Sequence, residues 1–344
     1  MTTEKRRSFP AWIPATILAA VLLYFALRGV EWRRVGAIIA GAQWTYLIGS
    51  LATASLALLL RAFRWRILLN SGINSEATES PQTKLGVVTV FWATTAGYLG
   101  NLLLPARAGE LVRTFLISAK SGLSKTFVLT TALGERMMDA IALILFSSLA
   151  LLTVESQPAW MKAMARSMAV VATVAAVGIA VLPYIHEQIE TLLRKLPLPA
   201  KLRDKLIQLI EQVILGLRAF HDVRRFAAFA ALTVVTWTTD TCGAMLTAHA
   251  LGLHVSFPVA LLFLSALGLS SALPSTPGYV GIYQFVAVTV LGPFGIARDP
   301  AVAYVIVMQA ITYVVMIMYG VPGIIKLGGS LSAMRKMSQE RGVS

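Results

Sequence analysis

Apolar runs long enough to cross a lipid bilayer recur along almost the whole chain, and they restrict its fold more than any other feature. A transmembrane helix needs about 20 mostly apolar residues. Of the 344 residues, 57% are hydrophobic and only 13% are charged, whereas the surface of a soluble protein needs about twice that share of charge. No segment alternates strictly between polar and apolar residues, which argues against an outer-membrane barrel. The sequence therefore predicts an all-α, polytopic helical membrane protein with about 6–8 transmembrane helices.

The apolar runs also indicate where the helices lie. We expect them near 11–28, 44–62, 85–104, 126–154, 164–185, 226–252, 256–273, 279–295 and 301–326. The segment 29–43 predicts a short interfacial helix, and 187–225 predicts a basic, amphipathic cytoplasmic linker. The whole of 1–344 is expected to form one membrane domain, with basic cytoplasmic segments at 1–10 and 327–344.

The basic residues predict the topology. The net charge is +14, and the bases lie mostly between apolar runs, which favours positive-inside orientation and anionic lipid over nucleic acid as the partner. The first apolar run follows three basic residues and resembles an uncleaved signal anchor. If 85–104 crossed completely, four bases would face outside: Arg107, Arg113, Lys120 and Lys125. We therefore expect this segment to dip in and return. Both termini are then expected in the cytoplasm, and the protein in the cytoplasmic (inner) membrane.

Proline and glycine interrupt two apolar segments in opposite halves of the chain. On the topology above, the two interruptions enter from opposite faces, which is the pattern of an inverted repeat with broken helices around a midplane site. The alternative is that these residues only kink two ordinary helices. The expected turn residues are Pro105 and Gly109 in the first segment, and Pro274, Pro277, Gly278 and Gly281 in the second.

Charged residues follow the first interruption directly. An ionisable side chain at the bilayer centre costs about 2.5–3.5 kcal/mol, so such residues pair, line a wet cavity or bind something. Arg107, Glu110 and Arg113 are spaced three apart and share a face on a helix. Two guanidiniums around one carboxylate suit the phosphate of a lipid head group. An interfacial salt-bridge cluster that fixes the hairpin is the alternative.

A second charged group opens the next apolar run. Glu135 and Asp139 lie four residues apart, and Arg136 alone cannot neutralise both. One of the two acids is therefore expected to meet Arg107 or Arg113, and Asp240 is a further candidate partner. Buried ion-pair networks often have a structural role. We therefore expect these charged residues to hold the helices together and also to line the cavity.

No recognised catalytic motif accompanies these charges. His186, His221, His249 and His254 are scattered without metal-ligand spacing, and there is no nucleotide-binding or nucleophile motif. We expect no metal and no cofactor, and a transporter rather than an enzyme.

Three linked motifs closely resemble the lysylphosphatidylglycerol synthase transmembrane (flippase-like) family. They are Asn101…Pro105-Ala-Arg107-Ala-Gly109-Glu110-Leu-Val-Arg113, then Glu135-Arg136-Met-Met-Asp139, then Pro274-x-x-Pro277-Gly278-x-x-Gly281. The run Arg64-Trp65-Arg66-Ile-Leu-Leu69 is also similar to the family's Arg-Trp-x-x-Leu-Leu element. Two departures occur at the second hairpin, where Tyr279 stands in place of a common Gly and Gln284 in place of a common Glu.

The resemblance implies an inner-membrane protein related to domains proposed to flip lipids or lipid-linked molecules. Only a short basic segment follows 326, so we expect a stand-alone member without the soluble aminoacyl-transferase domain. A membrane-embedded transferase is one alternative, and a partner that positions a lipid-modifying enzyme or glycosyltransferase through 200–221 is another. The expected partners are membrane lipids with anionic head groups, and the expected cavity residues are Asn101, Arg107, Glu110, Arg113, Glu135, Arg136, Asp139, Asp240 and Gln284.

Overall fold

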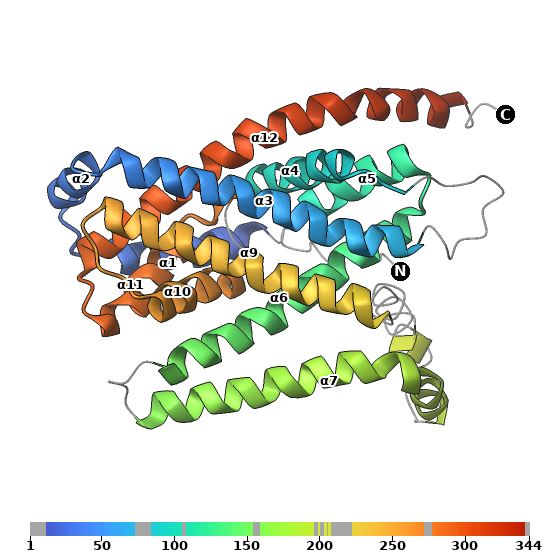
Figure 1. Ribbon diagram of the computed structural model, residues 1–344, viewed down its shortest axis with the longest axis horizontal. Coiled ribbons are helices and arrows are strands. Elements are labelled where there is room, and N and C mark those ends of the chain that lie inside the picture. The colour runs from blue at the N-terminus through green and yellow to red at the C-terminus, as the bar shows by residue number, and fades with distance from the viewer. Residues whose placement is uncertain are drawn as a thin grey trace, which may run out of the picture.

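Every element that the structure describes is helical, which confirms the all-α prediction (Figure 1). The structure is a computed structural model that describes residues 12–72, 84–104, 108–153, 159–195, 199, 203–204, 206–207, 222–271 and 277–340. The α-helices are α1 (Trp12–Leu27), α2 (Trp32–Ala40), α3 (Trp44–Gly72), α4 (Val87–Leu103), α5 (Gly109–Ser121), α6 (Lys125–Thr153), α7 (Ala159–Lys195), α9 (Val223–Ala250), α10 (Phe257–Ser270), α11 (Ile282–Leu291) and α12 (Arg298–Glu340). Two short 3₁₀ helices, η3 (Pro277–Tyr279) and η4 (Gly292–Phe294), flank α11.

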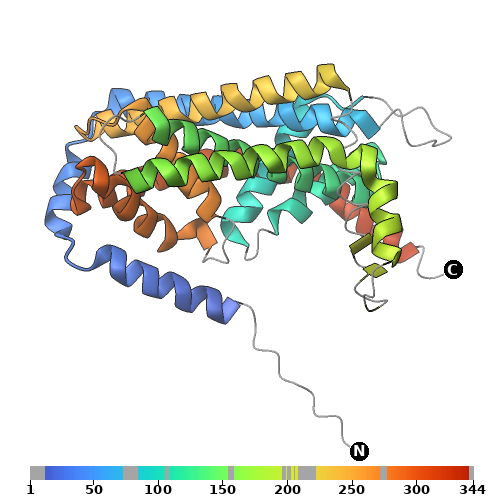
Figure 2. The same cartoon turned by 90° about the horizontal axis from the view of Figure 1, so that it is seen from below.

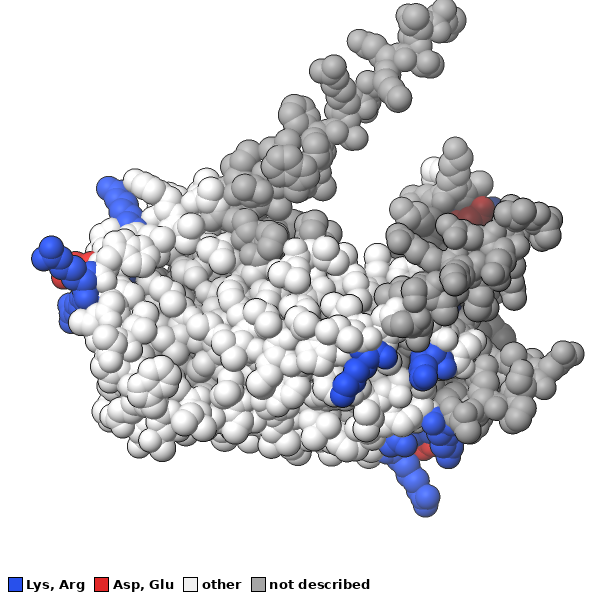
Figure 3. Space-filling model, turned by 90° about the horizontal axis from the view of Figure 1, so that it is seen from above, with Lys and Arg blue, Asp and Glu red and all other residues white. Residues whose placement is uncertain are grey.

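The helices have the lengths and composition of a membrane protein. Within the described residues, three are long and apolar enough to cross a bilayer by themselves: Trp44–Ser71, Lys125–Thr153 and Arg298–Gly328. Shorter apolar helices accompany them, among them α4 and α10. On the face in Figure 3, Lys and Arg side chains lie toward the two ends of the long axis and leave an uncharged band between them. A helical membrane protein is thus confirmed, while the number of its crossings stays a prediction.

Three helices run further than the hydropathy pattern indicates. α3 continues past 62 to Gly72 because its arginines are paired and its last turns carry buried apolar side chains, Leu68 and Leu69. α7 covers 159–195, so it includes the first residues of the segment predicted as the linker. Most of the remaining linker, including most of 200–221, lies outside the described residues, as does 1–10. α12 likewise extends through most of the predicted tail.

The two interrupted segments form the expected hairpins and enter the bundle from opposite ends (Figures 1 and 2). α4 and α5 make the first hairpin, and α10 and α11 make the second. At 1.5 Å per residue, the 13 residues of α5 span about 20 Å and the 10 residues of α11 about 15 Å, both short of the ~30 Å hydrocarbon core. The chain therefore turns back where it was expected to dip in and return.

The turns of the two hairpins contact each other inside the bundle. α4 packs against η3, and a methyl group placed on Gly278 would lie 3.6 Å from a Leu102 methyl carbon. Because α5 runs back beside α4, the end of α5 and the start of α6 pack near the end of α3. Lys120 and Lys125 belong to the first two of these segments and Arg66 to the third. This is the grouping of bases that the predicted topology requires, although which end faces the cytoplasm stays a prediction.

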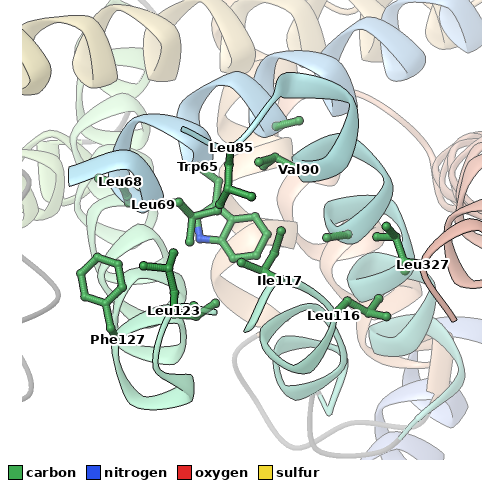
Figure 4. Close-up of a cluster of buried hydrophobic side chains, with 14 of the residues drawn as sticks. Trp65, Leu68, Leu69, Leu85, Val90, Leu116, Ile117, Leu123, Phe127 and Leu327 are labelled. Carbon is green, nitrogen blue, oxygen red and sulfur yellow. The ribbon is translucent and has the colours of Figure 1, made fainter. Parts of the chain in front are cut away.

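A buried apolar cluster attaches the first hairpin to the rest of the bundle. Trp65 of α3 is fully buried at its centre, and its indole N–H donates to the Thr131 hydroxyl of α6 at 3.2 Å. Around it pack side chains from six helices, α3, α4, α5, α6, α9 and α12, and from the segment just before α4. Figure 4 labels most of the larger ones: Leu68, Leu69, Leu85, Val90, Leu116, Ile117, Phe127 and Leu327. A second cluster, centred on Phe263 and Tyr304, holds α9, α10, α11 and α12 together.

Small residues let α4 and α5 approach closely. A side chain on Gly109 would collide with the backbone carbonyl of Gly97, and one on Gly100 would lie 2.8 Å from the Gly109 Cα. Membrane helices commonly pack through such small residues, because close backbone contact replaces the hydrophobic effect as the driving force. Gly109 of the first motif, together with Gly97 and Gly100 just before that motif, therefore sets the spacing of the hairpin.

We predict that Gly109→Ala will destabilise the protein, because overpacking that a backbone must relieve costs about 1–3 kcal/mol or more. The midpoint of thermal unfolding in detergent should fall by several degrees. Gly178→Ala is the matched control, since a methyl group there meets nothing within 4 Å and alanine favours a helix. An unchanged midpoint for Gly109→Ala would contradict the close-packed hairpin.

Candidate functional site

A network of buried ion pairs joins α3, α5 and α6. Glu135 lies at its centre, 2.9 Å from a guanidinium nitrogen of Arg64 and 2.9 Å from one of Arg113. Arg64 also holds Asp139 at 2.6 Å, and Arg113 holds Glu110 at 2.5 Å. Arg64, Arg113 and Glu135 expose 2% or less of their surface. The predicted pairing of an α6 acid with the first hairpin, through Arg113, is thus confirmed.

Arg136 completes the network at its more open edge. Its Nε donates to Glu110 Oε1 at 2.9 Å, and its Nη1 lies 3.8 Å from Asp139 Oδ2. Three guanidiniums then face three carboxylates, so the charges of this network cancel. That balance explains how six ionisable groups are accommodated in an apolar bundle, since an unpaired buried charge would be strongly unfavourable.

Arg64 belongs to this network but is not among the site residues predicted from the sequence. The sequence signal for Arg64 is the Arg-Trp element that resembles the family pattern. In the structure, Trp65 packs beside the ion pairs, and the Arg113 guanidinium lies 4.4 Å from the centre of its ring. A second signal is that three arginines, at 61, 64 and 66, stand late in an apolar helix, where charged side chains need partners.

A cavity of about 280 Å³ lies between the ion pairs and the hairpin turns. Helices α3, α4, α6, α9, α10, α11 and α12 all contribute to its wall. Its lining is mostly apolar, with four charged side chains, five aromatic ones and several hydroxyls. The charged residues are Arg61, Arg136, Asp139 and Asp240, the aromatic ones are Tyr98, Trp237, Tyr279, Tyr283 and Tyr313, and the hydroxyl groups include those of Ser50, Thr53 and Thr247.

A second ion pair borders this cavity. Arg61 of α3 and Asp240 of α9 are 2.5 Å apart, and each exposes 17% of its side chain. The Arg61 guanidinium lies 5.8 Å from the centre of the Trp237 ring. Asp240 was a further candidate partner for the charges near the first hairpin, and the structure pairs it with Arg61, which lies one helical turn from Arg64 on α3. The cavity wall therefore carries two separate guanidinium–carboxylate units.

The turn of the second hairpin depends on three positive φ angles. Gly278 has φ +74°, Tyr279 +60° and Gly281 +95°. The Gly278 carbonyl accepts hydrogen bonds from Gln309 at 3.0 Å and from the Tyr313 hydroxyl, both on α12. Tyr279 stacks on Tyr283 with ring centres 5.0 Å apart. A tyrosine with φ in the left-handed region costs about 1–2 kcal/mol. The Tyr279 side chain is part of the cavity lining.

Gln284 has a different position from the one that the sequence suggested. Its carbonyl oxygen accepts from the Gly281 N–H at 2.7 Å, and its amide donates to Gln309 at 2.6 Å. The side chain is buried and does not line the cavity. It therefore holds the start of α11, and Gln309, which does line the cavity, extends this hydrogen-bond chain.

The predicted site residues divide into three groups. Asn101, Arg136, Asp139 and Asp240 line the cavity, and Asn101 also accepts from the Gly109 N–H at 2.9 Å. Glu110, Arg113, Glu135 and Gln284 are buried behind the wall. Gly109, Pro277, Gly278 and Gly281 lie at the hairpin turns, whereas Pro105, Arg107 and Pro274 lie outside the described residues.

Acidic and imidazole side chains do not gather into a ligand set in the described part of the chain, where no three His, Cys, Asp or Glu residues could hold one metal ion. His249 and His254 lie beside each other at the end of α9, with ring centres 6.0 Å apart. The cavity offers hydrogen-bonding and charged groups around a mostly apolar space.

A family model matches most of the chain. The family described as lysylphosphatidylglycerol synthase TM region matches residues 12–320, which include both hairpins and every residue that lines the cavity. No curated protein matches the chain.

We predict that Glu135→Gln will lower stability more than Asp240→Asn. Each change removes one negative charge, but Glu135 is buried and shared by two guanidiniums, whereas the Arg61–Asp240 pair is partly open. Breaking a buried pair costs about 3–5 kcal/mol, and a partly exposed pair costs less. Thermal unfolding of the purified variants measures the difference. Equal midpoints for the two variants would show that Glu135 is not the centre of the network.

Proposed function

Because the chain belongs to the lysylphosphatidylglycerol synthase TM family, we propose that it moves a lipid or a lipid-linked molecule across the cytoplasmic membrane. Membership supports a function that involves membrane lipids. The observation that carries the finer proposal is the cavity between two hairpins that enter from opposite ends. In secondary transporters, broken helices from inverted repeats meet around a substrate site near the middle of the membrane.

The size and lining of the cavity suit a head group better than a whole lipid. Its volume of about 280 Å³ lies at the lower end of the range for small-molecule sites. The charged, aromatic and hydroxyl side chains offer contacts to a polar group, and the acyl chains would stay in the bilayer. An anionic head group, as the sequence suggested, is part of this proposal.

Arg136 gives a physical route from binding to movement. It lines the cavity, yet it also holds Glu110 of the first hairpin at 2.9 Å. A head group that binds the Arg136 guanidinium competes with Glu110 and weakens the attachment of α5 to α6. Because a ligand shifts a conformational equilibrium by its differential affinity for two states, this competition would favour displacement of the hairpin.

We predict that Arg136→Gln will slow lipid translocation in proteoliposomes about ten- to a hundredfold, since a hydrogen bond to a charged group contributes about 1.5–3 kcal/mol. Labelled anionic and zwitterionic phospholipids should be compared, with movement between leaflets measured by quenching from outside.

Arg34→Gln is the matched control, because Arg34 is exposed on α2 and contacts only Asp299, at 3.8 Å, among the described ion pairs. Translocation at the unaltered rate by folded Arg136→Gln protein would refute the competition mechanism. If the unaltered protein moved no lipid of either class, the translocator proposal itself would be wrong.

A further inference from the structure

Two buried hydrogen-bond donors of the cavity residues have no partner among the described side chains and backbone. They are the hydroxyl of Tyr98 on α4 and the indole N–H of Trp237 on α9. Native proteins leave few buried polar groups unpaired, and such a group calls for a bound water, an ion or a ligand. Both residues line the cavity, so its occupant is the natural candidate.

These two donors cannot be satisfied within their own helices. A serine or threonine hydroxyl can bond to the carbonyl one turn earlier, and this route is open to the unpartnered hydroxyls of Thr94 and Ser265, neither of which lines the cavity. A phenol hydroxyl and an indole N–H extend too far from the backbone for that contact. The indole can only donate, so its missing partner is an acceptor.

Each of the two donor residues has an arginine guanidinium over its aromatic ring. The Arg136 guanidinium lies 5.1 Å from the centre of the Tyr98 ring, and that of Arg61 lies 5.8 Å from the centre of the Trp237 ring. The first unit comes from α4 and α6, and the second from α3 and α9. Two similar donor groups thus border one cavity from different helices.

Each acid of the wall already accepts from an arginine, and further N–H donors border the cavity. Both carboxylate oxygens of Asp139 accept from Arg64, at 2.6 and 2.8 Å, and Asp240 accepts from Arg61 at 2.5 Å. A guanidinium has five N–H groups. The hydrogen bonds of Arg61 and Arg136 described above use Nη2 of the first and Nε of the second. The wall therefore has N–H donors to spare for a group with several acceptor oxygens.

We propose that this wall binds a phosphate group, with Tyr98 and Trp237 as recognition donors beside the guanidiniums of Arg61 and Arg136. Arginine matches the geometry of phosphate oxygens and forms charge-assisted hydrogen bonds with them. The inference deepens the proposed function and rests on it for the source of the phosphate, a phospholipid head group. Trp237 and Arg61 lie outside the three motifs, so this part of the site comes from the structure alone.

Tyr98→Phe and Trp237→Phe test the donors and keep an aromatic ring beneath each guanidinium. Affinity of the purified, folded protein should be measured for phosphatidylglycerol and for diacylglycerol, which lacks the phosphate. Each variant should bind phosphatidylglycerol about tenfold more weakly, as expected for the loss of one hydrogen bond to a charged group, with unchanged affinity for diacylglycerol. Unchanged phosphatidylglycerol affinity in both folded variants would overturn the proposal.

Tyr319→Phe and Trp92→Phe are the matched controls, because neither residue lines the cavity. An equal loss of affinity in these controls would also overturn the proposal. Inorganic phosphate, added as a competitor, separates two sources of the same chemistry. If inorganic phosphate competes with the lipid, and Trp237→Phe weakens that competition, the site also binds the free anion. If inorganic phosphate does not compete, and Trp237→Phe still weakens lipid binding, the site binds the head group of an intact lipid.

Because these are binding measurements, they are separable from transport. If the protein binds phosphatidylglycerol through Tyr98 and Trp237 but moves no lipid, the phosphate-site proposal stands and the translocation proposal is refuted. If the protein without both donors moves lipid at the same rate and binds it with the same affinity, the translocation proposal stands and the phosphate-site proposal is refuted.

Discussion

The contacts of Glu135 with Arg64 and Arg113 are the interaction on which the remaining structure depends. A charge in an apolar interior is tolerated when it is paired, so these three side chains can be buried only together. They come from α6, α3 and α5, and their pairing therefore holds the first hairpin against the two long helices. Trp65 fills the space beside them, with the Arg113 guanidinium on its ring. The apolar cluster and the ion pairs thus stabilise the same junction.

The cavity follows from the shortness of the hairpin helices. Neither α5 nor α11 is long enough to cross a bilayer, so each hairpin ends within the bundle and the turns contact each other there. Backbone that leaves a helix at this depth must be buried in protein or border a wet space. Gln309 and Tyr313 supply the hydrogen bonds that the Gly278 carbonyl needs. The polar wall and the non-helical turns therefore meet at one place.

The two departures from the family pattern have physical consequences at the second hairpin. Tyr279 adopts a φ of +60° that a glycine would adopt without strain, and it adds a stacked aromatic pair to the cavity lining. Gln284 is neutral, and both ends of its amide are satisfied by Gly281 and Gln309. A carboxylate there could not donate to Gln309 unless it were protonated. This chain thus has a neutral second hairpin, and the charges of its cavity come from α3, α6 and α9.

The sequence by itself determined the helical membrane class, the places of most helices, the two interrupted segments and the residues of the first ion-pair network apart from Arg64. These features depend on local composition, hydropathy and spacing, which are legible within one segment. Only the tertiary structure decided that Asp240 pairs with Arg61, that Gln284 supports α11, and that Tyr98 and Trp237 border the same space. Arg64 and Glu135 are 71 positions apart, and Arg61 and Asp240 are 179 apart. No local pattern encodes such partners, because they are selected by how the helices pack and by the cost of leaving a buried charge unpaired.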